Sequence, residues 1–272
     1  MVDLHTHSSC SDGSLSPAAL VDRSHAAGLS ALALTDHDIL HGIPEAQSRA
    51  DEIGLRFIPG VEIEIESSTG TFHLLGLNLG GNTDPLEARL AVIRERRAAR
   101  NETIARKMRD HGINATPYDF KSFAKGDVVS RLHIARFLIS RGVAKSVKEA
   151  FQRFLSPGKP FFEPKESMQF EEGVSLIHTA GGFAIMAHPY SLKLKKKALE
   201  KEILRYRERG LDGIEAFHSD YAPPDCLVLE TFGRTHGLLV TAGSDYHGDS
   251  WPERRLGYTA GGRPIEDRYL PF

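Results

Sequence analysis

The sequence begins MVDLHTHSSCSDG, which places two histidines and an aspartate close together. Side chains along a strand alternate between its two faces, so His5 and His7 would share one face if a strand begins at Val2. Asp12 and Gly13 follow in a polar, turn-prone stretch that can bring the carboxylate back toward the histidines. These residues could hold a metal ion, although a structural pair of histidines at a strand end explains them equally well.

Further apolar segments carry similar side chains in the run or just beyond it. They are LSALALTDHD, LRFIPGVEIEIE, TFHLLGLNL, GGFAIMAHP, LDGIEAFHS and GLLVTAGSDYH. Together with the N-terminal stretch they supply the candidate metal ligands His5, His7, Asp12, His37, Glu62, His73, His188, Asp245 and His247. Any one of these histidines alone would more readily be structural. Their common position at candidate strand ends favours one shared site.

The order of the elements predicts how these ends meet. Runs of Val, Ile, Leu and Ala alternate with helical patterns, which indicates parallel strands joined by helices. The first helix is expected to have Ser16 as its N-cap, Pro17 at its first position and Gly28 at its end. In an α/β barrel the C-terminal ends of the strands converge on one face, where active sites form. We therefore expect an α/β barrel with the candidate ligands at its mouth, near the ends of strands such as the one that ends close to Glu62.

Strand patterns stop between about residues 81 and 160. The segment DPLEARLAVIRERRAARNETIARKMRDHG predicts a long amphipathic helix, and SRLHIARFLISRG and SVKEAFQRFLSPG predict two more. Ser146 and Glu149 have the spacing of a capping box. We expect residues 1–80 and 161–272 to form the barrel and residues 81–160 to form a helical insert over its mouth. The basic run Arg94 to Arg100 is interpreted as a solvated helix face rather than a nucleic-acid groove.

The candidate ligands offer nitrogen and oxygen but no sulfur, which suits manganese, iron or zinc ions. Nine ligands are too many for one ion, so two or three divalent ions are expected, with Glu62 as the bridging carboxylate. Such a site has a net positive charge and attracts an anion such as a phosphate ester. Paired ions activate water and stabilise both the entering and the leaving oxygen of a phosphoester.

A second polar motif, Ser130-Arg131-Leu132-His133, opens one of the insert helices. With Ser130 as N-cap, Arg131 and His133 fall in the first turn, where free amides and the helix dipole favour an anion. Arg131 could bind phosphate oxygens, although a plain capped helix with solvated charges is an equally good interpretation. His218 is a candidate for positioning or protonating the leaving group.

The remaining polar candidates have weaker patterns. Asp38 and Glu64 flank expected ligands and could support them, or could lie on the surface. The other histidines fall inside helix or turn patterns and are expected to be structural: His25, His41, His111, His178 and His236.

Bulk properties exclude several classes of protein. The formal net charge is −2, so no overall basic field indicates binding to nucleic acid or to membranes. There is no apolar stretch of about 18 residues and no signal-peptide pattern, so a cytoplasmic location is expected. The two cysteines, Cys10 and Cys226, are too few for a disulfide framework. No motif indicates a protein partner.

The motifs DLHTHSSCSDG, TDHD, PGVEI, FHLLG, AHP and GSDYH occur in this order, and with them the chain resembles the PHP family, named for polymerase and histidinol phosphatase domains. The resemblance covers residues 1–79 and 161–257. It implies a distorted (βα)7 barrel, similar to TIM and amidohydrolase barrels, whose two or three metal ions hydrolyse phosphoesters. It also implies three ligand sets: His5, His7, Glu62 and Asp245; Glu62, His73 and His188; Asp12, His37 and His247. Some PHP proteins have His where Asp12 stands.

The helical insert is similar to that of small stand-alone PHP enzymes that act on nucleotides. This resemblance implies hydrolysis of the 3′-phosphate of a nucleoside 3′,5′-bisphosphate, with Mn²⁺ as the expected ion and Fe²⁺ or Zn²⁺ as alternatives. Asp245 and His218 are the expected catalytic side chains, and Ser130, Arg131, His133 and His218 the expected substrate contacts.

Other activities remain open at this stage. A 5′-to-3′ exoribonuclease or oligonucleotidase acting on short RNA or DNA would use the same metal ions on a diester. Less favoured are a histidinol-phosphate-type phosphatase, a metal-binding PHP module without turnover, and hydrolysis of a carbon–nitrogen bond, for which no suitable lysine stands at a clear strand end.

Overall fold

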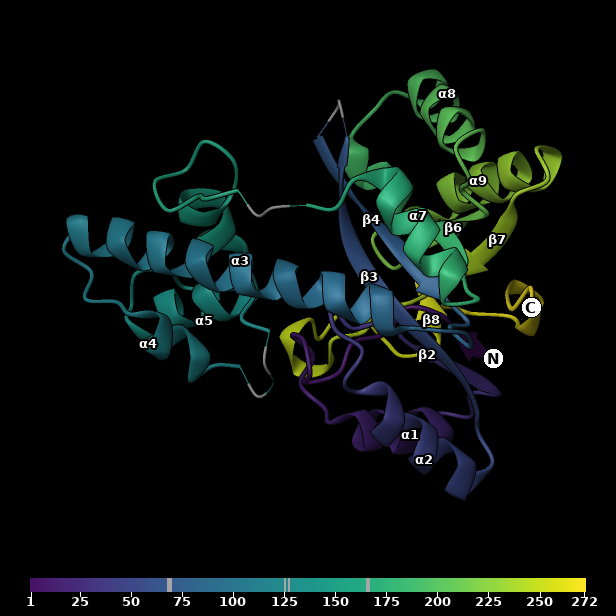
Figure 1. The fold of residues 1–272 in the computed structure, drawn as a ribbon, viewed down its shortest axis with the longest axis horizontal. Helices are drawn as coiled ribbons and strands as arrows, with labels where there is room; N and C mark the ends of the chain where they lie inside the picture. The colour runs from purple at the N-terminus through teal and green to yellow at the C-terminus, as the bar shows by residue number, and fades with distance from the viewer. Residues whose placement is uncertain (68–69, 125, 127, 165–166) are drawn as a thin grey trace.

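A seven-stranded sheet forms the centre of the molecule in the computed structural model, which describes residues 1–67, 70–124, 126, 128–164 and 167–272 (Figure 1). The strands neighbour one another in chain order: β1 (Val2–Asp3), β2 (Ala31–Leu34), β3 (Arg56–Ser67), β4 (Gly70–Leu77), β5 (Phe183–Met186), β6 (Gly213–Phe217) and β7 (Leu239–Ala242). The two edges approach each other, because the Leu4 N–H donates to the Ala242 carbonyl at 3.2 Å and Thr6 forms a bridge with Tyr246. The predicted α/β barrel of seven strands is confirmed.

Strand direction departs from the expectation of parallel strands. β1, β2 and β3 are parallel, as are β5, β6 and β7, but β4 runs antiparallel to both of its neighbours. Only two residues separate Ser67 from Gly70 in the sequence, which suffices for a hairpin but not for a parallel crossover. Because β4 is reversed, its beginning lies where the parallel strands end, and His73 therefore reaches the same face as the other candidate ligands.

β3 is also longer than expected. It spans twelve residues, and Glu62 lies within it rather than near its end. Its register pairs Glu62 with Leu75 and Glu64 with His73 on β4. The extended β3–β4 hairpin thus carries Glu62 and His73 side by side.

Helices surround the sheet and bury its outer face. They are α1 (Pro17–Ala26), α2 (Ile43–Ile53), α7 (Phe170–Thr179), α8 (Lys196–Arg207) and α9 (Pro223–Thr235). In Figure 1, α1 and α2 lie below the barrel and α8 and α9 above it. The predicted start of α1 is confirmed, because the Ser16 hydroxyl accepts from the Ala19 N–H and Pro17 is the first helical residue. Gly28, with φ +79°, follows the last turn. A short hairpin, β8 (Tyr258–Thr259) with β9 (Arg263–Pro264), lies near the C-terminus.

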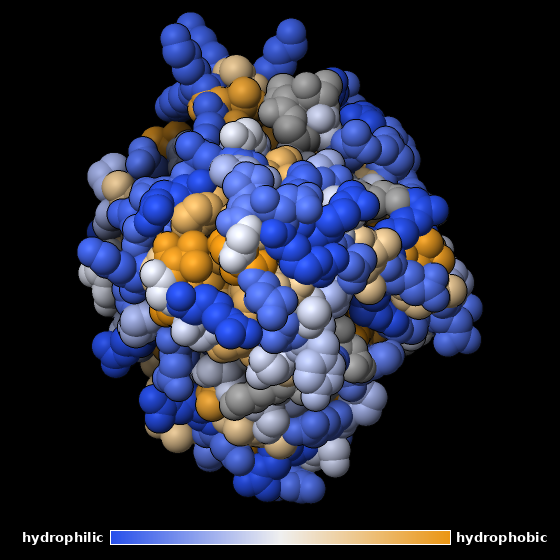
Figure 2. Space-filling model, turned by 90° about the vertical axis from the view of Figure 1, so that its left-hand side faces the viewer, coloured by the Kyte–Doolittle hydropathy of each residue, from blue (hydrophilic) through white to orange (hydrophobic). Residues whose placement is uncertain are grey.

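A second group of helices extends away from the barrel, as Figure 1 shows. It contains α3 (Asp84–Asp110), α4 (Pro117–Lys121), α5 (Arg131–Ser140) and α6 (Val147–Ala150), which continues into a π-helical turn at Phe151–Leu155. These helices share a hydrophobic core of their own, built from residues such as Ile104, Phe120, Phe137 and Leu155. Their outer face is mainly hydrophilic, with small apolar patches (Figure 2). The three predicted helices are confirmed; the domain boundaries at residues 80 and 160 stay a prediction.

Helix α3 connects the two cores. Its first half packs Leu86, Leu90 and Ile93 into the barrel core, and its second half packs Ile104 and Met108 into the core of the other helices. The residues between these halves therefore lie at the junction of the two cores. Within the described part of the chain, none of the helices is long and apolar enough to cross a membrane.

Candidate metal centre

The first group of candidate ligands joins the N-terminal strand to β3 and to the loop after β7. His5 Nε2 and His7 Nε2 each lie 3.3 Å from Glu62 Oε2. The same two nitrogen atoms lie 3.4 Å and 3.1 Å from Asp245 Oδ1. All four side chains are buried. The predicted ligand set of His5, His7, Glu62 and Asp245 is thus brought together within one ion's reach.

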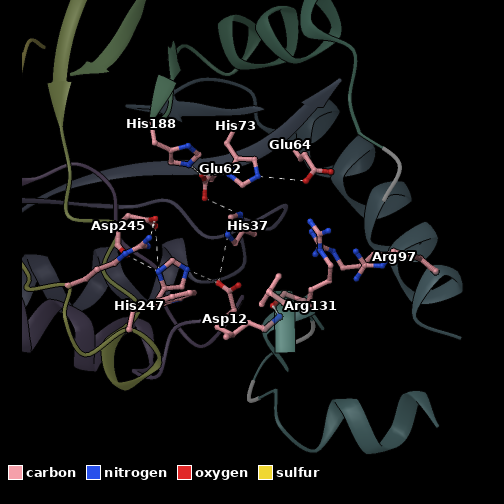
Figure 3. Close-up of a pocket in the computed structure, with 16 residues that line it drawn as sticks. Asp12, His37, Glu62, Glu64, His73, Arg97, Arg131, His188, Asp245 and His247 are labelled. Carbon is pink, nitrogen blue, oxygen red and sulfur yellow. Dashed lines mark hydrogen bonds and ion pairs between the residues drawn. The ribbon is translucent and has the colours of Figure 1, made fainter. Parts of the chain in front are cut away.

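The second group of candidate ligands also surrounds the carboxylate of Glu62. Glu62 Oε1 lies 2.7 Å from His73 Nδ1 and 3.0 Å from His188 Nε2. His37 Nδ1 lies 3.0 Å from Glu62 Oε2. His37 therefore stands between this group and the third one, to which the family resemblance assigned it. Both oxygen atoms of Glu62 face histidines, which is the arrangement that a bridging carboxylate requires (Figure 3).

The third group lies toward the loop after β1. His247 Nε2 is 3.2 Å from Asp12 Oδ1, and His37 Nε2 is 3.9 Å from the same oxygen. His7 joins His37, Asp12 and His247 within coordination distance, so it lies between the first and third groups. All nine candidate ligands named from the sequence are therefore neighbours in space.

The loop that carries Asp12 is held by a buried carboxylate, Asp36. The N–H and hydroxyl of Ser8 donate to Asp36 at 2.8 Å and 2.5 Å, and the Ser11 hydroxyl donates to it at 2.5 Å. A Cβ atom on Gly13 would lie 2.2 Å from the His7 carbonyl oxygen, so this tight turn requires glycine. The turn brings Asp12 back toward His7, as the sequence predicted.

Electrostatic coupling within the cluster is strong. Burial lowers the pKa of His7, but the carboxylates of Asp245 and Glu62 outweigh it and raise the pKa to about 9. Burial opposes the charged form of His73 as well, yet Glu62 raises its pKa to about 10. Burial raises the pKa of Glu62, whereas the surrounding histidines, His37 foremost, hold it well below the usual range. The carboxylates therefore attract positive charge, which a proton or a metal cation can supply.

Among the residues that the structure describes, several buried ligand atoms have no hydrogen-bond partner. They are His5 Nε2, both ring nitrogens of His7, and Glu62 Oε2. Buried polar atoms in folded proteins almost always have a partner, and these atoms converge on a common space. Nitrogen and oxygen donors in such number fit borderline divalent cations. The residues present therefore fit the divalent metal ions predicted from the sequence.

The ligand cluster forms one end of a cavity of about 260 Å³. Arg97 and Arg131 lie toward the other end (Figure 3), and Arg100 and Ser130 also line the cavity. Arg97 donates to the buried carboxylate of Asp38, and both Nε and Nη2 of Arg100 donate to Asn101 Oδ1. Burial, together with the neighbouring Arg97 and Arg131, lowers the pKa of Arg100 to about 9, and burial also lowers the pKa of Arg131. Arg100 and Arg131 remain cationic at neutral pH, and together with Arg97 they give this end of the cavity a positive surface.

The interpretation of Arg94 to Arg100 as a solvated helix face is wrong for Arg97 and Arg100, which are only 7% and 6% exposed. They continue the buried stripe of α3 that begins with Leu86, Leu90 and Ile93, at the three- and four-residue spacing of a helix face. This spacing was the available signal. Arg96 is exposed, and Arg94 is partly buried and donates to the Asp38 carbonyl.

A family model described as the PHP domain matches residues 3–212. The chain belongs to this family. It is 34% identical to a 3′,5′-nucleoside bisphosphate phosphatase of Chromobacterium violaceum, over 97% of this chain and 93% of the relative. It is 35% identical to the 5′-3′ exoribonuclease Rnm of Escherichia coli, over 90% of this chain and 84% of that protein. A solved structure of an amidohydrolase from C. violaceum, with bound sulfate and no metal, superimposes with a TM-score of 0.89 at 32% identity, covering 98% of this chain and 92% of that one.

Glu215 and Arg254 are further charged residues beside the candidate ligands that were not singled out from the sequence as site residues. Glu215 Oε1 lies 3.0 Å from His5 Nδ1, and Glu215 Oε2 accepts from the His188 N–H at 2.8 Å. Arg254 donates through Nη1 to Asp245 and through Nη2 to Asp220, the latter at 2.8 Å. Glu215 follows the same strand-end pattern as the ligands, which was a usable signal. Arg254 follows no such pattern.

The predicted substrate contacts differ in their position relative to the cavity. Ser130 and Arg131 line the cavity, but His133 and His218 do not. His133 Nδ1 accepts from the Ser130 N–H at 3.0 Å in a capping box, and burial lowers its pKa to about 4. His218 is 2% exposed, and its Nε2 lies 3.2 Å from Asp245 Oδ2. Direct substrate contact by these two histidines stays a prediction, and both are placed to support a neighbour that faces the cavity.

The structure also locates the residues that were expected to support the ligands and the histidines that were expected to be structural. Asp38 and Glu64 are buried beside the candidate ligands, with the Ser167 hydroxyl donating to Glu64 and with Glu64 lining the cavity. The histidines expected to be structural neither line the cavity nor join a candidate metal group within the described residues: His25, His41, His111, His178 and His236.

Proposed function

We propose that the protein is a metal-dependent phosphatase that hydrolyses the 3′-phosphate of nucleoside 3′,5′-bisphosphates and releases the 5′-monophosphate and phosphate. One observation carries this proposal. A single cavity has a cluster of metal-ligand side chains at one end and Arg97, Arg100 and Arg131 at the other. A substrate with two phosphate groups can place one at each end, whereas a simple monophosphate uses only one. The C. violaceum phosphatase, similar over nearly the whole chain, supports this assignment.

The metal ions would be held in the three groups described above. His5, His7, Glu62 and Asp245 would hold the first ion. Glu62, His73 and His188, with His37 adjacent, would hold the second, and Asp12, His37 and His247 the third. Two or three divalent ions are expected, and Mn²⁺ is favoured over Fe²⁺ and Zn²⁺. The chemistry that such ions supply when bound is polarisation of the phosphoryl oxygens and activation of a water molecule.

The chain's own residues then have separate tasks. Arg131 and Arg97 bind the phosphate that is not hydrolysed, through charge-assisted hydrogen bonds from desolvated guanidinium groups. This binding fixes the distance of the 3′-phosphate from the ligand cluster and so orients it for attack. Asp245 presents Oδ1 to the cluster, because His218 and Arg254 hold its Oδ2. His218 thus acts through Asp245 as a positioning residue.

A second candidate function is 5′-to-3′ hydrolysis of short RNA or DNA, which the similarity to the E. coli exoribonuclease favours. The same cavity would bind a terminal phosphate at the arginines and place the first diester at the ligand cluster. The two activities differ in their products. A phosphatase releases inorganic phosphate, and a nuclease releases nucleoside monophosphates in series. The cytoplasmic location and the absence of a protein partner stay predictions from the sequence.

The test is phosphate release from adenosine 3′,5′-bisphosphate by protein loaded with Mn²⁺, with the nucleotide product identified by chromatography. The expected products are phosphate and adenosine 5′-monophosphate, and phosphate should be released much faster than from adenosine 3′-monophosphate. Release of adenosine 3′-monophosphate would mean that the substrate binds in the opposite direction. Absence of release from the bisphosphate, with stepwise hydrolysis of a short 5′-phosphorylated RNA, would replace the phosphatase by the nuclease.

A further inference from the structure

The cavity has an aromatic part that neither phosphate would use. Among the described residues that line it, Phe151 and Trp251 are the aromatic side chains apart from the histidines. Phe151 opens the π-helical turn after α6, and Trp251 lies in the loop that follows β7. Trp251 is partly buried. Two phosphates are bound by charge and do not require an indole. We therefore expect Trp251 to contact a third, uncharged part of the ligand.

Trp251 is held rigidly by its surroundings. Its backbone N–H donates to the Gly248 carbonyl at 3.2 Å, and its backbone carbonyl accepts from the Arg254 backbone N–H at 3.0 Å. The Arg254 guanidinium lies 5.1 Å from the indole ring centre, within the range of a cation–π contact. That guanidinium is itself fixed by Asp245 and Asp220. One face of the indole therefore contacts the fixed guanidinium of Arg254. This contact holds the ring in place, so that a flat group can stack on its other face.

The geometry points to Trp251 as the stacking platform for the nucleobase of the substrate. This inference rests on the proposed function and adds to it the part of the nucleotide that the phosphate contacts leave unassigned. With the phosphates bound at the ligand cluster and at the arginines, the base is the remaining large apolar group of a nucleoside bisphosphate. Stacking on an aromatic ring is available to every base, so Trp251 selects nucleotides over simple sugar phosphates without selecting one base.

A binding experiment on the metal-free protein tests the contact directly. Trp251 is the single tryptophan of the chain, so selectively excited tryptophan fluorescence reports on this residue alone. Adenosine 5′-monophosphate should quench the emission with saturation, whereas ribose 5-phosphate, which lacks the base, should bind with little quenching. Binding of the nucleotide is measured in parallel by equilibrium dialysis. If dialysis shows the nucleotide bound while the emission is unchanged, the platform is ruled out.

A kinetic experiment with the Mn²⁺-loaded enzyme separates stacking from support of Arg254. The substrates are adenosine 3′,5′-bisphosphate and an abasic analogue, 1-deoxyribose 3,5-bisphosphate. Trp251→Ala should lower kcat/KM for the nucleotide about 5- to 100-fold, chiefly through KM, and leave the abasic analogue nearly unchanged. Trp251→Phe should restore most of the loss. Tyr118→Ala, at a position 84% exposed and outside the cavity, is the matched control.

Each outcome has a distinct meaning. Equal losses on both substrates would overturn the inference, because Trp251 would then only support Arg254 and Asp245. Equal kcat/KM for the two substrates in the wild-type enzyme would overturn it as well. If the wild-type enzyme hydrolyses neither substrate and dialysis shows no bound nucleotide, the proposed function fails together with the inference. If the enzyme hydrolyses the bisphosphate but Trp251→Ala affects both substrates alike, the proposed function stands and only the inference is overturned.

Discussion

His5 Nδ1 lies 3.0 Å from Glu215 Oε1, and both side chains are fully buried. A carboxylate at Nδ1 fixes the histidine with its proton on that atom, so Nε2 presents its lone pair toward Glu62 and Asp245. Because Oε2 of the same Glu215 accepts from the His188 N–H, one carboxylate orients a ligand of the first group and the backbone of a ligand of the second.

Glu215→Gln should weaken metal binding while preserving the fold. The amide keeps the shape of the side chain but removes the charge that makes His5 a stronger ligand. We expect an increase in the dissociation constant for Mn²⁺ of about 10- to 100-fold, measured by competition with a fluorescent chelator. Activity at saturating Mn²⁺ should recover toward that of the wild type. Glu230→Gln is the control, since Glu230 is also a buried glutamate but pairs with Arg234 on α9. An unchanged dissociation constant for Glu215→Gln would show that His5 needs no such partner.

Glu62→Gln should remove metal ions from two groups together. Both oxygen atoms of Glu62 face histidines, and an amide presents a single acceptor oxygen. We expect the Mn²⁺ content per chain, measured by elemental analysis after dialysis, to fall and phosphate release to drop to background, with an unchanged circular dichroism spectrum. Glu64→Gln on the same strand should lose little metal, since Glu64 reaches His73 only at 3.7 Å and is bonded by Ser167. Equal metal loss in both variants would remove the bridging role of Glu62.

The sequence predicted the barrel and gathered the candidate ligands because both depend on short-range patterns. An apolar run that ends in His, Asp or Glu can be recognised within ten residues of sequence. Strand direction cannot be recognised in this way, because the pattern of TFHLLGLNL is the same whichever way β4 runs. The direction depends on the hairpin that joins β3 to β4, and the consequence is that His73 reaches the site from the beginning of its strand.

The arginine end of the cavity was harder to predict for a different reason. Arg97 and Arg100 occupy positions on α3 that an apolar residue would normally fill. Their spacing from Ile93 places them on the buried face of α3, but the sequence does not show that this face passes between two hydrophobic cores at this point and lines a cavity. Arg254 and Trp251 lie in a loop without periodicity, so no pattern could assign them to the site.

Arg131→Gln should weaken binding of the phosphate that is not hydrolysed. A charge-assisted hydrogen bond from the partly buried guanidinium of Arg131 predicts an increase in KM for adenosine 3′,5′-bisphosphate of about 10- to 100-fold. The KM for adenosine 3′-monophosphate, which lacks the second phosphate, should change little. Arg153→Gln, in an exposed pair with Glu149, is the control. Equal effects on both substrates would place Arg131 at the hydrolysed phosphate instead.

The same substitution should stabilise the protein when no anion is bound. Arg97, Arg100 and Arg131 crowd one end of the cavity, and the lowered pKa of Arg100 reflects both its burial and these like charges. Burial disfavours the charge of Arg131 and lowers its pKa despite the attraction of Glu64, so the Tm of Arg131→Gln in chloride buffer should exceed that of the wild type. Added inorganic phosphate should raise the Tm of the wild type and have less effect on the variant. A lower Tm for the variant in chloride would show that Arg131 stabilises the fold independently of anions.

His133 should make the protein sensitive to mild acid. Burial lowers its pKa to about 4 in the folded chain, from an ordinary value of 6.5. As the pH falls through this interval the unfolded chain binds the proton first, so the free energy of unfolding decreases, by about 3 kcal/mol in total, and then levels off below the folded pKa. His133→Gln keeps an acceptor for the Ser130 N–H at the third position of the capping box but cannot titrate. Urea unfolding of the metal-free proteins at a series of pH values should therefore show the wild type losing stability relative to His133→Gln between pH 6.5 and 4. Parallel curves for the two proteins would mean that His133 remains protonatable in the folded state.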